Sequence, residues 1–163
     1  MHINFEANGI VHFQDVRITY KNFAGKGDVY NREGDRNFAI IIDDPKIADA
    51  LIAEGWNVSI KPPREEGDLP FMTLKVKVKF NDFGPYCYLV TGNVQTKLDE
   101  DTVHRLDKVR ISHVDLYIRP HDWVRQEGTP HEKTGRTAYL TDIRVVQQQV
   151  DRFADYGNET EPF

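Results

Sequence analysis

The sequence predicts a mostly β fold over its 163 residues. Its apolar runs are short, and Gly, Pro, Asn and Asp separate them at close intervals, which is typical of strands joined by turns. The clearest strand lies at residues 74–80, where apolar residues alternate with lysines. This alternation sends the apolar side chains to a buried face and the lysines to an exposed one.

The first half of the chain contains two expected strands, at residues 9–22 and 36–43. In the first of them Val16, Ile18 and Tyr20 alternate with polar residues. A polar loop rich in glycine separates the two strands, and its glycines allow backbone angles closed to other residues. We therefore expect this loop to be a candidate binding loop.

Two short helices are expected, at residues 45–54 and 100–107. Asp44 and Pro45 form an N-cap and first-turn pair for the first helix, and Gly55 ends it. Asp99 is the expected N-cap of the second helix. Further strands are expected at residues 56–61, 71–80, 86–96, 110–119 and 137–148, the last two flanking a polar hairpin with Gly128, Thr129, Pro130 and Gly135.

The length of the chain suits one domain of ordinary size. We place this domain at residues 1–150 and an acidic C-terminal tail at residues 151–163, where four acidic residues accompany one arginine. The tail has no apolar periodicity, so we expect it to be disordered. The chain carries one cysteine, no apolar run of membrane-spanning length and no signal-like start, which predicts a cytoplasmic protein without a membrane partner.

The formal net charge of −5 argues against a nucleic-acid partner, but the charge is unevenly distributed. Residues 71–98 hold four lysines and one aspartate. Lys75, Lys77 and Lys79 would stand about 7 Å apart along one face of a strand, close to the phosphate repeat of an extended nucleic acid. The alternative is a solvated outer face, because edge strands use lysine to discourage aggregation.

Aromatic residues accompany the basic ones in several segments, as single-strand binding requires: bases stack on aromatic rings while Lys and Arg neutralise phosphates. For Phe23, as for Tyr20, Phe38 and Trp56, a place in the core is the alternative, and we expect Trp56 to be buried. The candidate nucleic-acid-binding residues are Arg17, Lys21, Phe23, Tyr30, Arg32, Arg36, Lys75, Lys77, Lys79, Tyr86, Tyr88, Trp123 and Arg125.

An enzymatic function has little support in the sequence. His113, Asp115, His121, Asp122 and His131 could contribute to a metal site, as in a metal-dependent nuclease, but their spacing matches no established ligand pattern. Phosphate-binding loops and nucleophile elbows are absent from the sequence. We expect no catalysis, no metal and no cofactor.

Three segments resemble bacteriophage single-stranded DNA-binding proteins with an OB-type fold: Asn22-Phe23-x-Gly25, Asn31-x-x-Gly34-x-Arg36-Asn37-Phe38 and Gly55-Trp56-Asn57-Val58. The resemblance covers residues 17–145. It implies an OB-like small barrel that binds single-stranded DNA without sequence preference in phage replication, recombination or repair. The expected fold is thus a mostly β, OB-like barrel with two short helices and an acidic tail.

The end of the tail is similar in kind to the acidic tips with which bacterial single-stranded DNA-binding proteins recruit replication and repair partners. Here the acidic residues are more widely spaced, and no long Gly/Gln-rich linker precedes them. The expected partner-binding residues are Asp155, Glu159, Glu161, Pro162 and Phe163. An ordinary solubilising tail is the alternative. For the whole chain, the alternative function is a non-catalytic protein-interaction module, and exposed strand edges would allow a homodimer.

Overall fold

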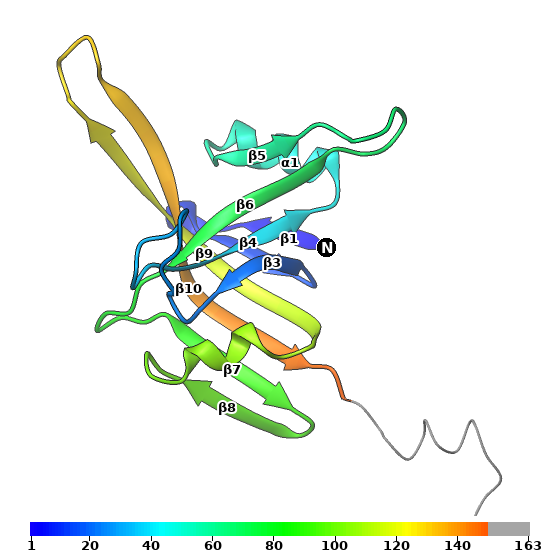
Figure 1. Cartoon of the computed structure of the whole chain (residues 1–163). Helices are drawn as coiled ribbons and strands as arrows, with labels where there is room; N and C mark the ends of the chain where they lie inside the picture. The colour runs from blue at the N-terminus through cyan, green and yellow to red at the C-terminus, as the bar shows by residue number, and fades with distance from the viewer. Residues whose placement is uncertain (150–163) are drawn as a thin grey trace, which may run out of the picture.

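The computed structural model describes residues 1–149 as one strongly curved sheet with one α-helix and two short 3-10 segments (Figure 1). The predicted mostly β fold is confirmed. In chain order the elements are β1 (His2–Phe5), η1 (Ala7–Gly9), β2 (Val11–Gln14), β3 (Arg17–Asn22), β4 (Arg36–Ile42), α1 (Pro45–Ala53), β5 (Val58–Lys61), β6 (Phe71–Val78), β7 (Tyr86–Thr91), β8 (Val94–Leu98), η2 (Val103–Asp107), β9 (Ile111–Arg125) and β10 (Lys133–Gln147).

The strand order β1-β2-β9-β10-β6-β4-β3 is OB-like. Strands β3, β4 and β6 pair antiparallel, and β10 then pairs parallel to β6 through Ala138 opposite Val76. β5 adds to β6, while β7 pairs with β10 and β8. Within residues 1–149 no ladder joins β3 to β9, so the sheet is not closed. A backbone hydrogen bond from the Val16 N–H to the Val114 carbonyl, at 3.0 Å, crosses this opening.

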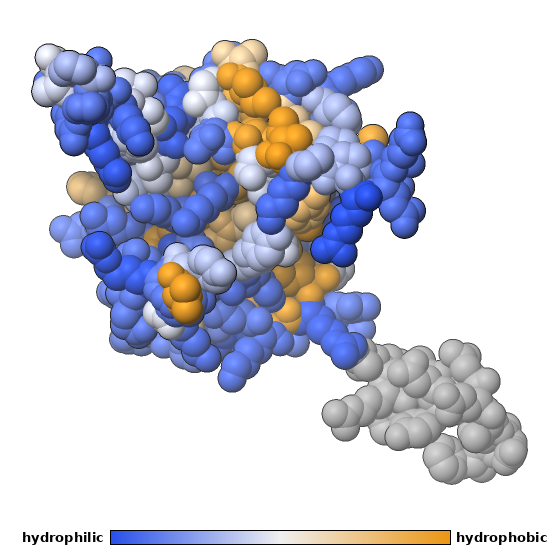
Figure 2. All heavy atoms as spheres, turned by 45° about the horizontal axis from the view of Figure 1, so that its top comes forward, coloured by the Kyte–Doolittle hydropathy of each residue, from blue (hydrophilic) through white to orange (hydrophobic). Residues whose placement is uncertain are grey.

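The inner face of the sheet forms the hydrophobic core. On β6, Leu74, Val76 and Val78 are buried and the intervening lysines are exposed, which confirms the predicted alternation. Trp56 is buried as expected, with 4% of its surface exposed. Most of the surface seen in Figure 2 is hydrophilic, and its hydrophobic side chains lie in small patches.

The first predicted helix is confirmed as α1, where the Asp44 carboxylate accepts a hydrogen bond from the Lys46 N–H at 2.9 Å. The second is the 3-10 segment η2. Its buried residues, Val103 and Leu106, are three positions apart, which suits three residues per turn. Asp99 caps the preceding turn, since its carboxylate accepts hydrogen bonds from the N–H groups of residues 101 and 102.

Two predicted strands are each divided. Asp15 has a φ of 52°, and this turn separates β2 from β3 within the expected strand at residues 9–22. Gly92, with a φ of 61°, lies in the tight turn between β7 and β8, so the expected strand at residues 86–96 is a hairpin. Both breaks use the left-handed backbone region, which an alternation pattern does not reveal.

The last two strands are longer than predicted. β9 and β10 pair continuously to Arg125 opposite Lys133, so only residues 126–132 form a loop. Their ends project from the body as a two-stranded arm, residues 119–139 (Figure 1). The sequence predicted a polar hairpin there but ended its strands at residues 119 and 137, because a ribbon that is largely solvent-exposed needs no buried apolar face to mark its strands.

No helix among residues 1–149 has the length and apolar character needed to cross a membrane. The predicted acidic tail, residues 151–163, and its candidate partner-binding residues lie outside the described residues.

Candidate nucleic-acid interface

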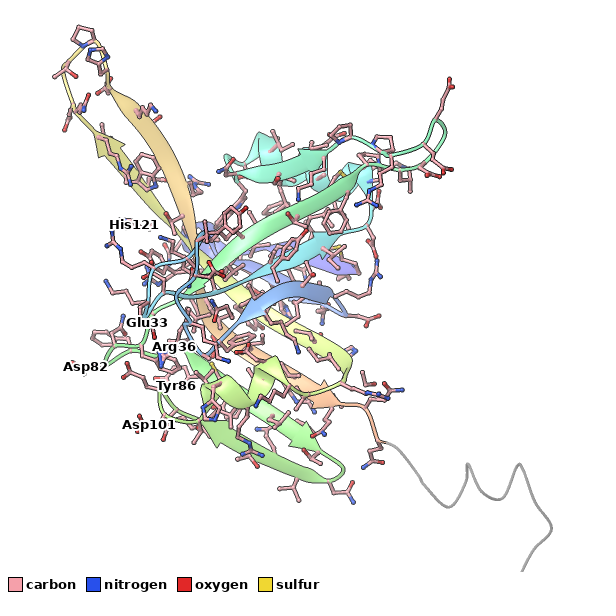
Figure 3. All side chains as sticks on the ribbon, viewed as in Figure 1. Glu33, Arg36, Asp82, Tyr86, Asp101 and His121 are labelled. Carbon is pink, nitrogen blue, oxygen red and sulfur yellow. The ribbon has the colours of Figure 1, made fainter. Side chains whose placement is uncertain are left out.

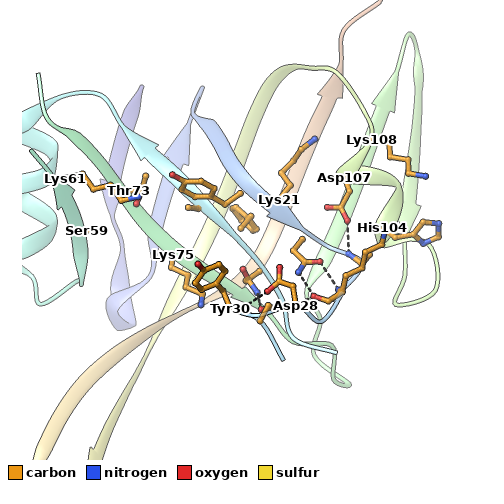
Figure 4. Close-up of a pocket in the computed structure, with 18 residues that line it drawn as sticks. Lys21, Asp28, Tyr30, Ser59, Lys61, Thr73, Lys75, His104, Asp107 and Lys108 are labelled. Atoms are coloured by element: carbon orange, nitrogen blue, oxygen red, sulfur yellow. Dashed lines mark hydrogen bonds between the residues drawn. The ribbon is translucent and has the colours of Figure 1, made fainter. Parts of the chain in front are cut away.

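A groove of about 930 Å³ crosses the outer face of β3, β4, β5 and β6 (Figure 4). Five lysines line it, and Lys61 and Lys108 stand at its opposite ends. Its charged and aromatic lining residues are Tyr20, Lys21, Lys26, Asp28, Tyr30, Phe38, Lys61, Lys75, His104, Asp107 and Lys108.

Small side chains form the floor of the groove. Ala39 on β4 is paired with Lys75 on β6, and Thr73 on β6 is paired with Ser59 on β5. Residues opposite one another in a ladder share a face, so these side chains lie side by side on the outer surface. Their small size leaves the sheet hollowed between the longer side chains at its borders.

The loop between β3 and β4 forms one wall of the groove and is held by side-chain amides. Asn31 donates from its amide nitrogen to the carbonyls of Lys26, Arg32 and Asp35 at 2.8, 3.1 and 3.0 Å. The Asn37 amide donates to the side-chain oxygen of Asn31 at 2.9 Å. Tyr30, which is 96% exposed, stands on this fixed loop.

A second set of contacts fastens the same loop to η2. The Asp107 carboxylate accepts hydrogen bonds from the N–H groups of Phe23 and Ala24 at 2.7 and 2.9 Å. The Lys21 ammonium donates to the carbonyls of Leu106 and Val109 at 2.8 and 3.2 Å. Partial burial lowers the pKa of Lys21, and the neighbouring Asp107 charge opposes this shift. Lys21 therefore lines the groove, but its ammonium is already hydrogen-bonded to two backbone carbonyls of the protein.

The prediction that Phe23 contacts nucleic acid is wrong. Its side chain is fully buried and stacks on Phe38 with ring centroids 5.1 Å apart. Arg36 is outside the groove lining as well, because its guanidinium donates to the carbonyls of Phe23 at 3.0 Å and Glu100 at 3.1 Å. In Figure 3 Arg36 lies toward the end of the molecule that carries Asp101.

The three predicted lysines of the β6 segment are all exposed, but they occupy different surroundings. Lys75 lines the groove. Lys77 is paired with Asn37 on one side and with Tyr139 of β10 on the other, and Lys79 follows the end of the strand. Lys77 therefore lies beside the base of the arm, next to the groove residue Lys75 on the same face of β6.

One face of the arm carries alternating basic and aromatic residues. The Arg119 guanidinium lies over the Tyr139 ring at 4.9 Å, and that of Arg125 lies over the Trp123 ring at 4.8 Å. Trp123 packs so closely on Gly135 that a Cβ there would overlap the indole. Because Tyr139 is paired with Lys77, this face is continuous with the outer face of β6.

The remaining predicted residues are not gathered at the groove. Arg17 is exposed opposite Ile41, and Arg32 is exposed on the β3–β4 loop; neither lines the groove. Tyr86 on β7 lies under the Lys97 ammonium at 5.0 Å, and Tyr88 lines a separate hollow beside Tyr117. The groove residues Lys26, Lys61 and Lys108 were not among the candidates, because only the tertiary structure brings their segments together. Tyr20, for which stacking and a place in the core were both open, is exposed and lines the groove.

The candidate metal ligands are dispersed. His121 lies against Tyr139, whereas Asp122 faces the other side of β9 and pairs with Arg136 at 2.6 Å. His113 lies between the carboxylates of Asp15 and Asp115, each 3.1 Å from a ring nitrogen. Residues 1–149 contain no group of three or more His, Cys, Asp or Glu side chains arranged to hold a metal ion.

Comparison with known proteins identifies the family. A family model described as "Putative phage ssDNA-binding domain" matches residues 6–160. The single-stranded DNA-binding protein from bacteriophage Enc34 in complex with ssDNA is similar in structure, with 15% identity, 92% of each chain covered and a TM-score of 0.53. A C-terminal truncation of that protein has 12% identity, 91% coverage of each chain and a TM-score of 0.53.

No curated protein sequence matches the chain. The structural likenesses, at low identity, establish a shared OB-like fold, and the family model spans nearly all of the sequence. The chain belongs to the family of phage ssDNA-binding domains.

Proposed function

We propose that this protein binds single-stranded DNA without sequence preference in the groove across β3, β4, β5 and β6. The observation that carries the proposal is the combination of four lysines besides the engaged Lys21 with the exposed Tyr20 and Tyr30 around one hollow. The similar phage Enc34 protein whose structure contains ssDNA supports the same ligand.

The chemistry of the groove favours single strands over duplex. Lysines attract phosphates and release their counterions, and these contacts carry no sequence information. The rings of Tyr20 and Tyr30 can stack only on bases whose faces are exposed, which a paired duplex does not offer. Together the two kinds of contact explain binding that is selective for single strands and indifferent to sequence.

The arm extends this path. Lys77 and Tyr139 join the outer face of β6 to the face of β10, and Trp123 with Arg125 continues it outward. An OB-like barrel uses the loops beside its binding face to hold oligonucleotides, and the arm is such a connection. A strand that leaves the groove beside Lys75 would therefore meet the arm.

In the infected cell the protein would coat single strands exposed during phage DNA replication, recombination or repair, in the host cytoplasm. Residues 1–150 would bind DNA, and the tail would recruit other proteins through Asp155, Glu159, Glu161, Pro162 and Phe163. Deleting residues 154–163 should leave DNA affinity equal or higher, since the removed acidic residues compete with DNA for the lysines. A marked loss of affinity would instead assign the tail to the DNA site.

The direct test is a fluorescence titration with single-stranded oligothymidine at low and high salt, beside a duplex of equal length. We expect saturable quenching by the single strand that weakens as salt rises, and a much smaller response to duplex. If neither fluorescence nor a gel shift responds, the DNA-binding proposal fails and the protein-interaction alternative takes its place.

A further inference from the structure

Tyr20 adopts a backbone conformation that is costly for its residue type. Its φ is 52°, in the left-handed region that bulky L-residues rarely occupy. The ladder between β3 and β4 shifts register between Thr19 and Asn22, so Tyr20 lies in a bulge. Bulges re-aim side chains, and strained residues persist where the surrounding structure imposes them, often at binding sites.

Burial does not explain this conformation, because the Tyr20 side chain is 59% exposed. The ring lines both the groove and a neighbouring hollow of about 480 Å³, so it stands between the two. Phe71 lines only the neighbouring hollow and meets Tyr20 edge to face, with centroids 6.4 Å apart and an interplanar angle of 86°. Phe71 thus supports the ring from the side away from the groove.

A cation lies over one face of the same ring. The Lys61 ammonium lies 5.7 Å from the Tyr20 centroid, and Lys61 is paired with Phe71 across the β5–β6 ladder. The three side chains come from three different strands, β3, β5 and β6. An exposed ring, an aromatic support and an adjacent positive charge are the components of a stacking site for one nucleotide.

We propose that Tyr20 is a base-stacking platform at the β5 end of the groove, with Phe71 as its support and Lys61 as the phosphate contact beside it. The proposal rests on the proposed function and assigns one of its subsites. Tyr30 on the β3–β4 loop stands on a different wall, so the groove would hold bases at two separate points.

The variant Tyr20→Asn tests the platform, because Asn tolerates the left-handed backbone and removes the ring. We expect its Kd for oligothymidine to rise about 5- to 150-fold, the range for loss of one stacked base. Its thermal unfolding midpoint should be unchanged or higher, and the dependence of Kd on salt should keep its slope, since no phosphate contact is lost. Tyr20→Phe should bind like the wild type.

Phe83→Ala is the matched control, since Phe83 is 88% exposed but lies outside the groove lining; its Kd should not change. On an abasic oligonucleotide of the same length, wild type and Tyr20→Asn should bind equally. The platform is overturned if Tyr20→Asn keeps wild-type affinity for oligothymidine, if its deficit persists on the abasic strand, or if Tyr20→Phe is equally weak. Failure of the wild type to bind any single strand would instead overturn the proposed function.

Discussion

The side-chain amide of Asn37 donates a hydrogen bond to the side-chain oxygen of Asn31, 2.9 Å away, and so joins the start of β4 to the loop before it. Asn22 closes the other end of the loop, accepting from the Lys26 N–H at 2.9 Å and donating to its carbonyl at 3.0 Å. These asparagines belong to the segments that resemble phage proteins. Their contacts show that this motif builds the loop on which Tyr30 stands.

Asn31→Ala should weaken DNA binding indirectly. The variant loses the hydrogen bonds that the Asn31 amide makes within the loop, so the loop and Tyr30 become more mobile. Because DNA binding must then pay the entropy cost of ordering Tyr30, we expect the Kd for single-stranded DNA to be several-fold higher. The slope of Kd against salt should not change, because no cation is removed. Hydrogen exchange of the loop amides should become faster in the variant, and Asn4→Ala on the exposed part of β1 is the control. Unchanged exchange with weakened binding would indicate direct contact by Asn31.

Lys61→Ala and Lys75→Ala should each weaken binding and flatten its salt dependence. Each lost phosphate contact lowers the slope of log K against log salt by about 0.7 for a single strand. Lys46→Ala, an exposed lysine on α1 outside the groove lining, serves as the matched control and should leave both quantities unchanged. If all three substitutions lowered DNA affinity equally, binding would depend only on the net charge of the protein and not on lysines in the groove.

Trp123→Phe should remove most of the tryptophan quenching caused by DNA. The other tryptophan, Trp56, is buried beneath the Arg136 guanidinium, so Trp123 is the one able to meet bases. Trp123→Ala should weaken binding of long oligonucleotides more than of short ones that fill the groove alone.

Val124→Ala controls for changes to the arm itself, since Val124 is the exposed neighbour on the opposite face of β9. If the length of the oligonucleotide makes no difference to the Trp123→Ala variant, the arm lies off the DNA path.

Asp122→Asn should destabilise the base of the arm at neutral pH and have no effect in strong acid. The hydrogen bond from Arg136 lowers the pKa of the Asp122 carboxyl. A carboxyl with a lowered folded-state pKa stabilises the fold above its unfolded pKa, and that contribution disappears as pH falls through the folded value. Unfolding midpoints of wild type and variant should therefore converge as pH falls below the usual Asp range. The effect is small because Asp122 is largely exposed, and a difference that is constant with pH would contradict this origin.

Several elements were predictable because their signals are local. The alternation in residues 74–80 fixes the faces of β6, and Asp44 with Pro45 starts α1 through contacts within two residues. The sequence also predicted basic and aromatic side chains on the outer face, where Tyr30, Lys75 and Lys77 are exposed.

Other roles depend on contacts between distant segments. From the sequence, Lys21 and Arg36 were expected to be available for phosphates. In the structure Lys21 donates a hydrogen bond to a backbone carbonyl 85 positions away, and Arg36 donates to a carbonyl 64 positions away. The sequence placed Phe23 in a polar loop, where it could be exposed, but in the structure it packs against Phe38 and is buried. Conversely, Lys26, Lys61 and Lys108 become neighbours of one groove only when their segments meet.

By itself the sequence determined a mostly β chain with a lysine-bearing outer face, because side-chain alternation and turn residues act over a few positions. Only the tertiary structure decided which cations remain free, how far the arm extends and that Tyr20 is turned outward by a bulge. The physical reason is that strand pairing and side-chain hydrogen bonds form between residues far apart in the chain, and no local pattern records them.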